Sequence, residues 1–298
     1  GPRPIDLHLT ALRTLGAEIS EIGGSLLCRA ERLHGGDILL TLPSVGATEN
    51  AILAACGAEG TTIISNAARE PEIVDLQDFL QKLGADVHGA GTSTITVRGG
   101  GVRHGCVHRC IGDRIAAATY LCAAAAAGGQ VTLQGVDYRH LATVTTALGQ
   151  AGCRLQCTED SITLESDGHL RAIPPVRTSP YPGFPTDAQA PLMAALLRSE
   201  GAVMFVENMF DSRYRHVPEL VRMGADIRLE GRVAVVYGTR ELHGAAVRCT
   251  DLRGGAALAI AALQTPDATL IHDIYHIQRG YQDMAGDLRA LGADAAVE

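Results

Sequence analysis

The sequence contains no tryptophan, and aromatic residues make up only 4% of its 298 residues. A hydrophobic core must therefore be built from leucine, isoleucine, valine and alanine. Hydrophobic residues still account for 46% of the chain and charged residues for 19%, which is typical of a globular protein and excludes a disordered one. The length allows two domains or one large one. An excess of positive charge is also missing. The net charge of −8 argues against nucleic acid as a partner, so an anionic ligand needs a local cluster of cations.

Long hydrophobic runs and targeting signals are absent as well. The longest apolar run covers residues 116–127, is interrupted only by Thr119, and is too short to cross a bilayer. No basic segment followed by an apolar stretch opens the chain, so we expect no membrane partner. The eight cysteines follow no regular framework, which favours a reducing, cytoplasmic location over secretion.

A possible metal motif occurs where Cys106, His108 and Cys110 alternate along the chain. Alternation also places three side chains on one face of a strand, and no second pair of ligands follows nearby. Cys153 and Cys157 carry the same weak signal. The sequence therefore predicts no metal site.

The strongest signal for the fold is an internal repeat. Five similar segments each indicate the end of an amphipathic helix, a glycine just after it, and then a strand. The glycines are Gly16, Gly84, Gly152, Gly224 and Gly292, separated by 68, 68, 72 and 68 residues. This spacing predicts a βα-type unit of about seventy residues that is used repeatedly.

The repeat also defines the domain organisation. Helices are expected over residues 48–55 and 113–126, between strands expected within residues 37–43, 61–67, 93–99, 130–136, 202–208 and 268–274. Glycine-rich residues 99–101 and the stretch up to Gly112 form the best boundary, which gives domains of residues 1–112 and 113–298. Only fifteen residues precede the first glycine, so we expect the front of the first unit to be absent.

Eight motifs extend this pattern to a specific family. They are "RPIDLH" (3–8), "LPSVGATENAILAA" (42–55), "NAAREPEIVD" (66–75), "GDRIAAATYL" (112–121), "YPGFPTDAQA" (181–190), "RHVPELVRMGADI" (215–227), "CTDLRGGAAL" (249–258) and "IYHIQRGYQDM" (274–284). Together they resemble the enolpyruvyl transferase family, in its nucleotide-sugar branch, nearly from end to end. The resemblance implies an α/β (α+β) fold, a two-lobed inside-out α/β barrel of repeated βα units. Residues 1–112 would be the remainder of an incomplete N-terminal lobe on the nucleotide-sugar side, and residues 113–298 a second lobe of three units.

The resemblance also implies an activity. The family branch transfers the enolpyruvyl group of phosphoenolpyruvate to the 3′-hydroxyl of UDP-N-acetylglucosamine and releases phosphate, the first committed step of peptidoglycan synthesis, without a cofactor. The family's Lys-Asn pair, one phosphoenolpyruvate-binding arginine and the proton-donating loop cysteine fall before Gly1. We therefore expect the chain alone to be inactive. The alternatives are a split protein that needs a complementary N-terminal fragment, and an enzyme acting on another nucleotide or on shikimate 3-phosphate.

Asp187 is the candidate catalytic residue. Pro182 and Pro185 place a helix start beside it, so either Thr186 or Asp187 is predicted to cap that helix. The resemblance gives Asp187 a second role, contact with the sugar 3′-hydroxyl as candidate base. A helix N-terminus lowers the pKa of a carboxylate, so orienting the hydroxyl is the safer description.

Two arginines, Arg253 and Arg279, are the candidate phosphoenolpyruvate ligands, because a guanidinium binds carboxylate and phosphate in a bidentate manner. Neighbouring glycines, Gly254, Gly255 and Gly280, are expected to let a ligand approach the backbone. Asp251 is a supporting candidate that either holds Arg253 or handles protons, and a purely structural salt bridge is the alternative.

The resemblance assigns the nucleotide-sugar contacts to two short stretches and one methionine. They are Arg3, Pro4, Ile5, Asp6, Leu7, Leu42, Pro43, Ser44, Val45 and Met209, in addition to Asp187. Ser44 and Gly46 lie just before a helix start expected near Thr48, a geometry that suits anions. Arg114, Glu70 and Glu72 are possible supporting residues.

Overall fold

The computed structural model describes residues 5–297. The chain divides into two compact units. Unit 1 runs to Ile111 and also includes Pro180–Pro182, and unit 2 comprises Gly112–Ser179 and the rest of the chain from Gly183. Within the described range, no helix combines the length and the apolar character needed to cross a membrane.

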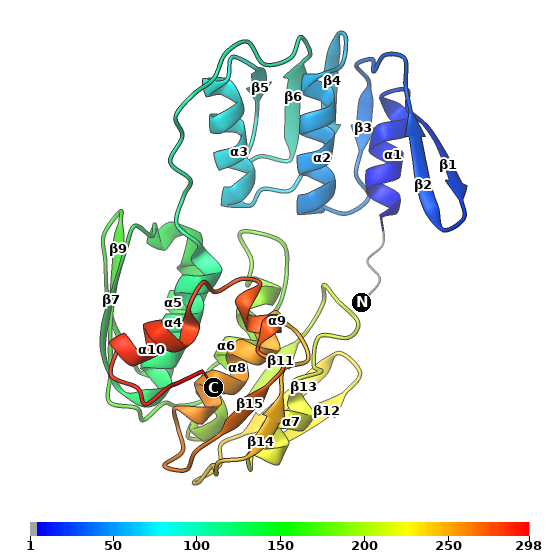
Figure 1. Ribbon diagram of the computed structural model, residues 1–298. Coiled ribbons are helices and arrows are strands. Elements are labelled where there is room, and N and C mark those ends of the chain that lie inside the picture. Colours follow the sequence, from blue (N-terminus) through cyan, green and yellow to red (C-terminus); the bar gives the residue numbers. More distant parts are fainter. Residues whose placement is uncertain (1–4, 298) are drawn as a thin grey trace. The chain divides into compact units, whose positions relative to one another are not determined.

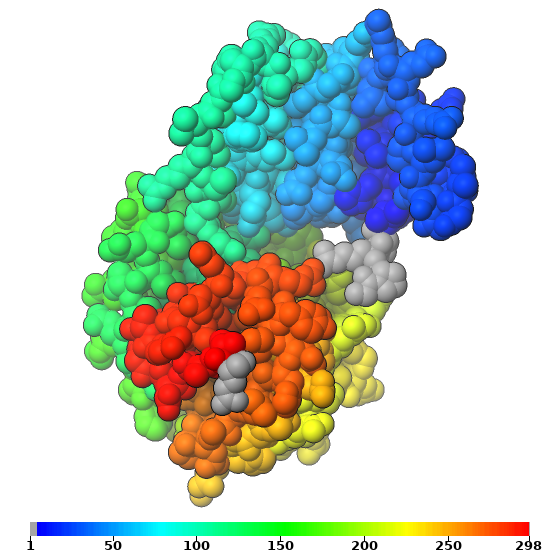
Figure 2. Space-filling model, viewed as in Figure 1, coloured from blue at the N-terminus to red at the C-terminus, as the bar shows by residue number. Residues whose placement is uncertain are grey.

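Unit 1 contains three helices that lie side by side against strands (Figure 1). Its elements are α1 (Asp6–Thr14), β1 (Glu18–Ile22), β2 (Ser25–Arg29), β3 (Asp37–Leu39), α2 (Val45–Cys56), β4 (Thr61–Ser65), α3 (Pro71–Lys82), β5 (Asp86–His88) and β6 (Thr94–Arg98). The β1–β2 hairpin, dark blue at the edge of this unit in Figures 1 and 2, is almost entirely exposed. Between α2, α3 and the sheet lies a separate core that includes Ile52, Ile64, Ile73 and Ile95.

Unit 2 is larger and has its own core. Its helices are α4 (Arg114–Ala127), α5 (Ala142–Ala151), α6 (Thr186–Ala195), α7 (Val217–Arg222), α8 (Leu252–Ala262), α9 (Tyr275–Gln278) and α10 (Met284–Ala290), with 3-10 turns η1 (Tyr138–Leu141) and η2 (Leu196–Arg198). Its strands are β7 (Gly129–Gln134), β8 (Arg154–Cys157), β9 (Ser161–Ser166), β10 (Val176–Arg177), β11 (Ala202–Val206), β12 (Asp226–Glu230), β13 (Val233–Tyr237), β14 (Ala246–Arg248) and β15 (Leu270–His272).

The same topology occurs in both units. One sheet of unit 1 has the order β3-β4-β6-β5, and one sheet of unit 2 has the order β10-β11-β13-β12. In each, the first two strands are parallel and joined through a helix, and the last two form an antiparallel hairpin. This repetition confirms the βα-type unit predicted from the glycine spacing.

The five periodic glycines terminate helices as predicted, but only four of them lead into a strand. All five have positive φ, between 85° and 117°, and each lies within two residues of the end of a helix. The described residues after Gly292 form no strand. The strands after the other four glycines each pair with the strand that comes next in the chain, and the described chain offers no such partner after Gly292.

Helix starts differ from the expected boundaries because of their caps. The helix expected over 48–55 begins at Val45, since Ser44 accepts a hydrogen bond from the Ala47 N–H at 3.4 Å. Thr48 is instead buried inside the helix, where its hydroxyl accepts a bond from the Ala68 N–H. The helix expected over 113–126 begins at Arg114, with Asp113 as its N-cap.

The inside of unit 2 consists of helices α4, α6 and α8, which pack against one another. Every residue from Ala188 to Ala195 of α6 and from Gly254 to Ala261 of α8 is buried. Small side chains on these helices allow the close approach that such packing requires. The sheets cover this helical centre, which agrees with the predicted inside-out arrangement (Figure 1).

A pair of glycines three residues apart tests the role of the periodic positions. Gly152 has a φ of 117°, and a Cβ there would make only ordinary contact with the His169 carbonyl oxygen at 3.8 Å, so Gly152→Ala should lower the free energy of unfolding by about 1–2 kcal/mol through backbone strain. Gly149 lies inside α5, where a Cβ would make ordinary contact with Leu155, so Gly149→Ala should raise it by up to about 1 kcal/mol. Urea titration of both variants measures the difference. Equal effects of the same sign would contradict the assignment of Gly152 as a helix terminator.

Candidate functional site

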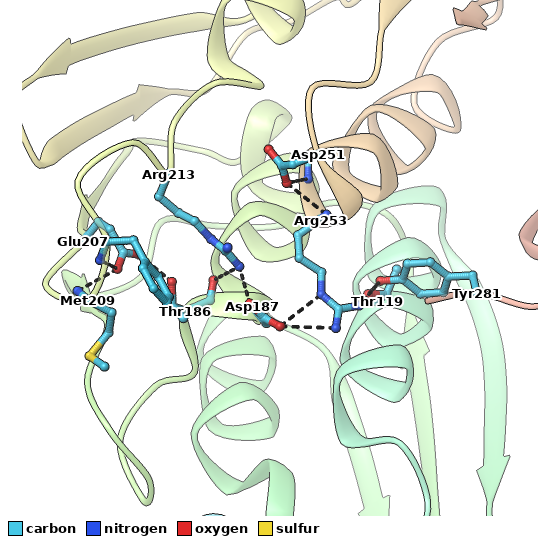
Figure 3. Close-up of polar contacts among 11 residues, drawn as sticks. Thr119, Thr186, Asp187, Glu207, Met209, Arg213, Asp251, Arg253 and Tyr281 are labelled. Carbon is cyan, nitrogen blue, oxygen red and sulfur yellow. Dashed lines mark hydrogen bonds and ion pairs between the residues drawn. The ribbon is translucent and has the colours of Figure 1, made fainter. Parts of the chain in front are cut away.

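The candidate site begins at the first turn of α6, where Asp187 is the second helical residue. Pro185 occupies the N-cap position, so the helix does start beside Asp187 as predicted. The prediction that Thr186 or Asp187 caps the helix is wrong, because no side chain caps α6. The Thr186 hydroxyl donates instead to Glu207 at 2.9 Å, and the Asp187 carboxylate is directed at two arginines (Figure 3).

Arg213 is the first of these arginines. Its Nη2 atom donates to Asp187 Oδ1, and its side chain is only 16% exposed. The guanidinium lies over the Phe210 ring at 5.6 Å. Its Nε atom is buried and has no hydrogen-bond partner among the described residues. Arg213 thus keeps an unused donor at the site.

The loop that carries Arg213 is held by a buried carboxylate. Glu207 follows β11 and is 1% exposed. Its Oε1 accepts bonds from the N–H groups of Met209 and Phe210, and its Oε2 accepts the Thr186 hydroxyl. One carboxylate therefore ties the 208–213 loop to the start of α6.

Arg253 is the second arginine that contacts Asp187. It lies in the first turn of α8 and is 12% exposed, and both its Nε and Nη2 atoms are 3.2 Å from Asp187 Oδ2. Its Nη1 atom donates to the Tyr281 hydroxyl at 3.1 Å, which lies 2.7 Å from the Thr119 hydroxyl of α4. The network therefore joins α4, α6 and α8 (Figure 3).

Asp251 contacts Arg253 through the backbone of that residue. Its Oδ1 accepts bonds from the backbone N–H groups of Arg253 and Gly254, which makes it the N-cap of α8. It holds the backbone of Arg253 and not the guanidinium.

The expectation that three glycines open the backbone to a ligand is wrong for this structure. A Cβ on Gly254 would lie 3.0 Å from His216, one on Gly255 would lie 2.7 Å from Ile277, and one on Gly280 would lie 2.8 Å from Leu252. Protein side chains already occupy these approaches. The glycines therefore serve the packing of α8 and its surroundings.

Burial and neighbouring charges determine the protonation states of Asp187 and His216. Burial would raise the pKa of Asp187, but Arg213 and Arg253 outweigh it and hold the pKa below its ordinary value. Burial lowers the pKa of His216 to about 4, so that ring adds no charge at neutral pH. Asp187 lies between two guanidiniums, whose planar donors suit an anionic ligand.

Arg279 is the other residue predicted to bind the anionic substrate, and it lies apart from Asp187. Arg279 is exposed just after α9 and lies outside the network, although Tyr281, two residues later, belongs to it. Met209 is 37% exposed and joins the site through its backbone N–H to Glu207.

Of the residues predicted to bind a nucleotide-sugar, Ile5–Leu7 and Leu42–Val45 lie at the starts of α1 and α2 in unit 1, whereas Met209 and Asp187 belong to unit 2. Ile5 occupies the N-cap position of α1 and Ser44 that of α2, and the two helices pack against each other. His8 Nδ1 and Asn50 Nδ2 are 2.6 Å apart across this contact, and a Cβ on Gly46 would lie 3.2 Å from the His8 ring. Asp6 and Leu7 open α1, and Leu42, Pro43 and Val45 surround the start of α2. Arg3 and Pro4 lie outside the described residues.

The possible supporting residues also lie at helix starts. Glu70 is buried before α3, where its Oε1 accepts the Tyr181 N–H at 3.4 Å, and Glu72 lies in the first turn of the same helix. Arg114 is the buried first residue of α4.

Sequence reasoning missed Arg213, Glu207, Tyr281 and Thr119. Arg213 and Arg215 are equally plausible in the sequence, and only the fold shows that Arg215 is exposed while Arg213 faces Asp187. A charged Glu207 directly after an apolar strand was the one available signal.

Comparison with known proteins places this arrangement in a family. Residues 1–288 match the family model described as EPSP synthase (3-phosphoshikimate 1-carboxyvinyltransferase). The chain belongs to the enolpyruvyl transferases. It is 47% identical to UDP-N-acetylglucosamine 1-carboxyvinyltransferase 2 of Caldanaerobacter subterraneus subsp. tengcongensis, covering 99% of this chain and 70% of that protein. It is 49% identical to UDP-N-acetylglucosamine 1-carboxyvinyltransferase of Zymomonas mobilis, covering 99% and 69%.

Solved enolpyruvyl transferases confirm the predicted fold class. The enolpyruvyl transferase NikO from Streptomyces tendae superposes with a TM-score of 0.89 at 27% identity, over 99% of this chain and 72% of that one. EPSP synthase from Acinetobacter baumannii matches with a TM-score of 0.72 at 21% identity, over 97% and 70%, and supports the fold alone.

The pKa of Asp187 in this enolpyruvyl transferase tests the electrostatic account. Because folding lowers that pKa, the ionised carboxylate stabilises the fold at neutral pH, and this contribution is lost as the pH falls through the folded-state value. Replacing both arginines, in Arg213→Gln/Arg253→Gln, removes the two groups that outweigh burial, so the pKa of Asp187 should rise. Carboxyl-carbon NMR titration measures the change. A pKa that stays low in the double variant would show that the helix N-terminus, and not the arginines, lowers it.

Proposed function

We propose that this protein transfers the enolpyruvyl group from phosphoenolpyruvate to the 3′-hydroxyl of UDP-N-acetylglucosamine and releases phosphate. The observation that carries the proposal is the 47–49% identity, over 99% of the chain, to proteins named for this reaction. The reaction belongs to peptidoglycan synthesis. Roles in cell-wall biogenesis, cell shape and division, and a cytoplasmic location, are part of the proposal.

Arg213 and Arg253 are the proposed cations for phosphoenolpyruvate, with Arg279 as a third. The first two already lie within contact of one carboxylate, are mostly buried, and have planar donors that suit carboxylate or phosphate. The unpartnered Nε–H of Arg213 favours an added acceptor, because an unsatisfied buried donor costs about 1–3 kcal/mol. The uncapped first turn of α6 adds backbone N–H groups at the same place.

Asp187 is proposed to contact the sugar hydroxyl. In addition of an alcohol to the enol carbon, the hydroxyl oxygen forms the new C–O bond and must lose its proton, while the neighbouring carbon gains one. A carboxylate whose pKa is held low accepts a hydrogen bond readily but a proton poorly. Asp187 therefore orients the hydroxyl, with proton loss late in the step.

The starts of α1 and α2 are proposed to contact the nucleotide-sugar. Ile5–Leu7 and Leu42–Val45 lie together there, and Ser44 presents its hydroxyl at a helix N-terminus, which favours an anion such as a diphosphate. Arg3, Pro4 and Met209 complete the proposed set, and Asp251, Arg114, Glu70 and Glu72 are proposed as supporting residues.

Choice of acceptor tests the function itself. The family model's name refers to 3-phosphoshikimate, which makes shikimate 3-phosphate the second candidate acceptor. We expect phosphate release from phosphoenolpyruvate by the full-length protein that carries this sequence to depend on UDP-N-acetylglucosamine and to be absent with shikimate 3-phosphate. The reverse dependence would overturn the proposal.

A matched pair of aspartates tests the role of Asp187 in the same protein. Asp187→Asn keeps the shape but removes the charge that orients the hydroxyl, so we expect kcat to fall on the order of 100-fold or more. Asp137 is also paired with an arginine, Arg139, and its pKa is also lowered, chiefly by that hydrogen bond, but it caps η1 outside the network. Asp137→Asn should leave kcat unchanged. Near-normal turnover of Asp187→Asn would reduce Asp187 to a structural partner of the arginines.

A further inference from the structure

A second cluster of reactive side chains lies in unit 1 and shares no residue with the Asp187 network. Asp75 on α3 and His108 and Cys110 in the segment after β6 each offer one ligand atom, and the three atoms lie within 4.8 Å of one another. In the described part of the chain, no other group of His, Cys, Asp and Glu meets this test. The sequence showed the alternating His108 and Cys110 but not the carboxylate from a helix 33 residues earlier.

The cluster is built on one face of α3. Asp75, Phe79 and Lys82 are spaced so that they share that face. The His108 ring packs against Phe79 with centroids 5.4 Å apart, and its side chain is only 7% exposed. His108 Nε2 lies 2.9 Å from Asp75 Oδ1, so two of the three ligand atoms are already adjacent.

The contact between His108 and Asp75 holds the chain segment that follows β6 against α3. The backbone after β6 is tied to unit 1 as far as His104, through bonds from Arg103 and His104 to the Leu83 carbonyl. The segment then runs past α3 (Figure 1), where His108 anchors it to that helix. A ligand that joined Asp75, His108 and Cys110 would strengthen this anchor.

We infer that Asp75, His108 and Cys110 form a binding site for a thiophilic divalent cation of the zinc type. Carboxylate oxygen, imidazole nitrogen and thiolate sulfur are the three ligand kinds that zinc uses, and three protein ligands leave a fourth position for water. Bonds of about 2.0–2.3 Å to a tetrahedral ion place ligand atoms about 3.5 Å apart, so closing the cluster from 4.8 Å needs a shift of only about 1 Å. Cys110 is a free, exposed thiol and is able to make that movement.

Binding changes the protons of the cluster in a defined way. Lys82 Nζ donates to His108 Nδ1 at 3.1 Å, so Nε2 carries the proton that Asp75 accepts. To bind the cation through Nε2, His108 takes its Nδ1–H form, and the exposed Lys82 side chain moves away. Cys110 gives up its thiol proton to solvent and binds as thiolate, so one proton is released for each cation bound.

Cobalt titration of the full-length protein is the direct test, because a thiolate–Co²⁺ bond produces a near-ultraviolet charge-transfer band and four-coordinate Co²⁺ produces intense visible bands. We expect one equivalent of Co²⁺ to give both, and one equivalent of Zn²⁺ to remove them. Cys110→Ser should abolish the charge-transfer band, and His108→Gln should weaken affinity by about 10- to 100-fold or more. Circular dichroism of each variant checks that it is folded.

Two further variants keep the result specific. Cys157→Ser removes another exposed thiol, outside the cluster, and should leave the spectrum unchanged. Lys82→Met removes the cation that competes for His108 and should tighten Co²⁺ binding several-fold. The inference is overturned if no stoichiometric thiolate band forms, if the band survives Cys110→Ser, or if Lys82→Met weakens binding. These spectra do not depend on enolpyruvyl transfer, so they test the metal site separately from the proposed function.

Discussion

Close packing of the three central helices is the constraint on which the rest of unit 2 depends. Helices α4, α6 and α8 contact one another through small side chains, and a Cβ on Gly255 would meet Ile277 at 2.7 Å and Cys249 at 2.8 Å. There is no room for a larger residue without displacement of a neighbour. With their spacing fixed in this way, the helices bring their first turns to one end, where side chains from all three join a single polar network.

The three first turns are not equivalent, and the difference creates the site. Asp113 and Asp251 cap α4 and α8, because their carboxylates accept hydrogen bonds from backbone N–H groups of their own helices. Asp187 lies two residues further into its helix, and its side chain does not cap that helix. Its carboxylate is therefore available to two guanidiniums. Glu207 instead holds the start of α6, through hydrogen bonds that link Thr186 to the 208–213 loop.

The sequence predicted the repeated unit because the C′ glycines and the apolar strands are local features with local causes. It also predicted a helix start beside Asp187, and the resemblance named Arg253 as a ligand candidate with Asp251 as its possible support. Arg213 and Tyr281 could not be found in this way, since each reaches the site from a loop whose path depends on long-range packing. The Asp75–His108 contact shows the same limit, because nothing near Cys110 indicates that a carboxylate of α3 lies beside it.

The pairing of Asp187 with arginines connects substrate binding to proton transfer, on the proposed function. Two opposing influences act on its pKa: burial raises it, and Arg213 and Arg253 lower it. An anion that takes donors from both guanidiniums weakens the second influence and leaves the first. The carboxylate then becomes a better proton acceptor only after the anionic substrate is in place, and the Arg213→Gln/Arg253→Gln variant imitates that state. A base activated in this order does not remove a proton from the sugar before there is an enol carbon for its oxygen to attack.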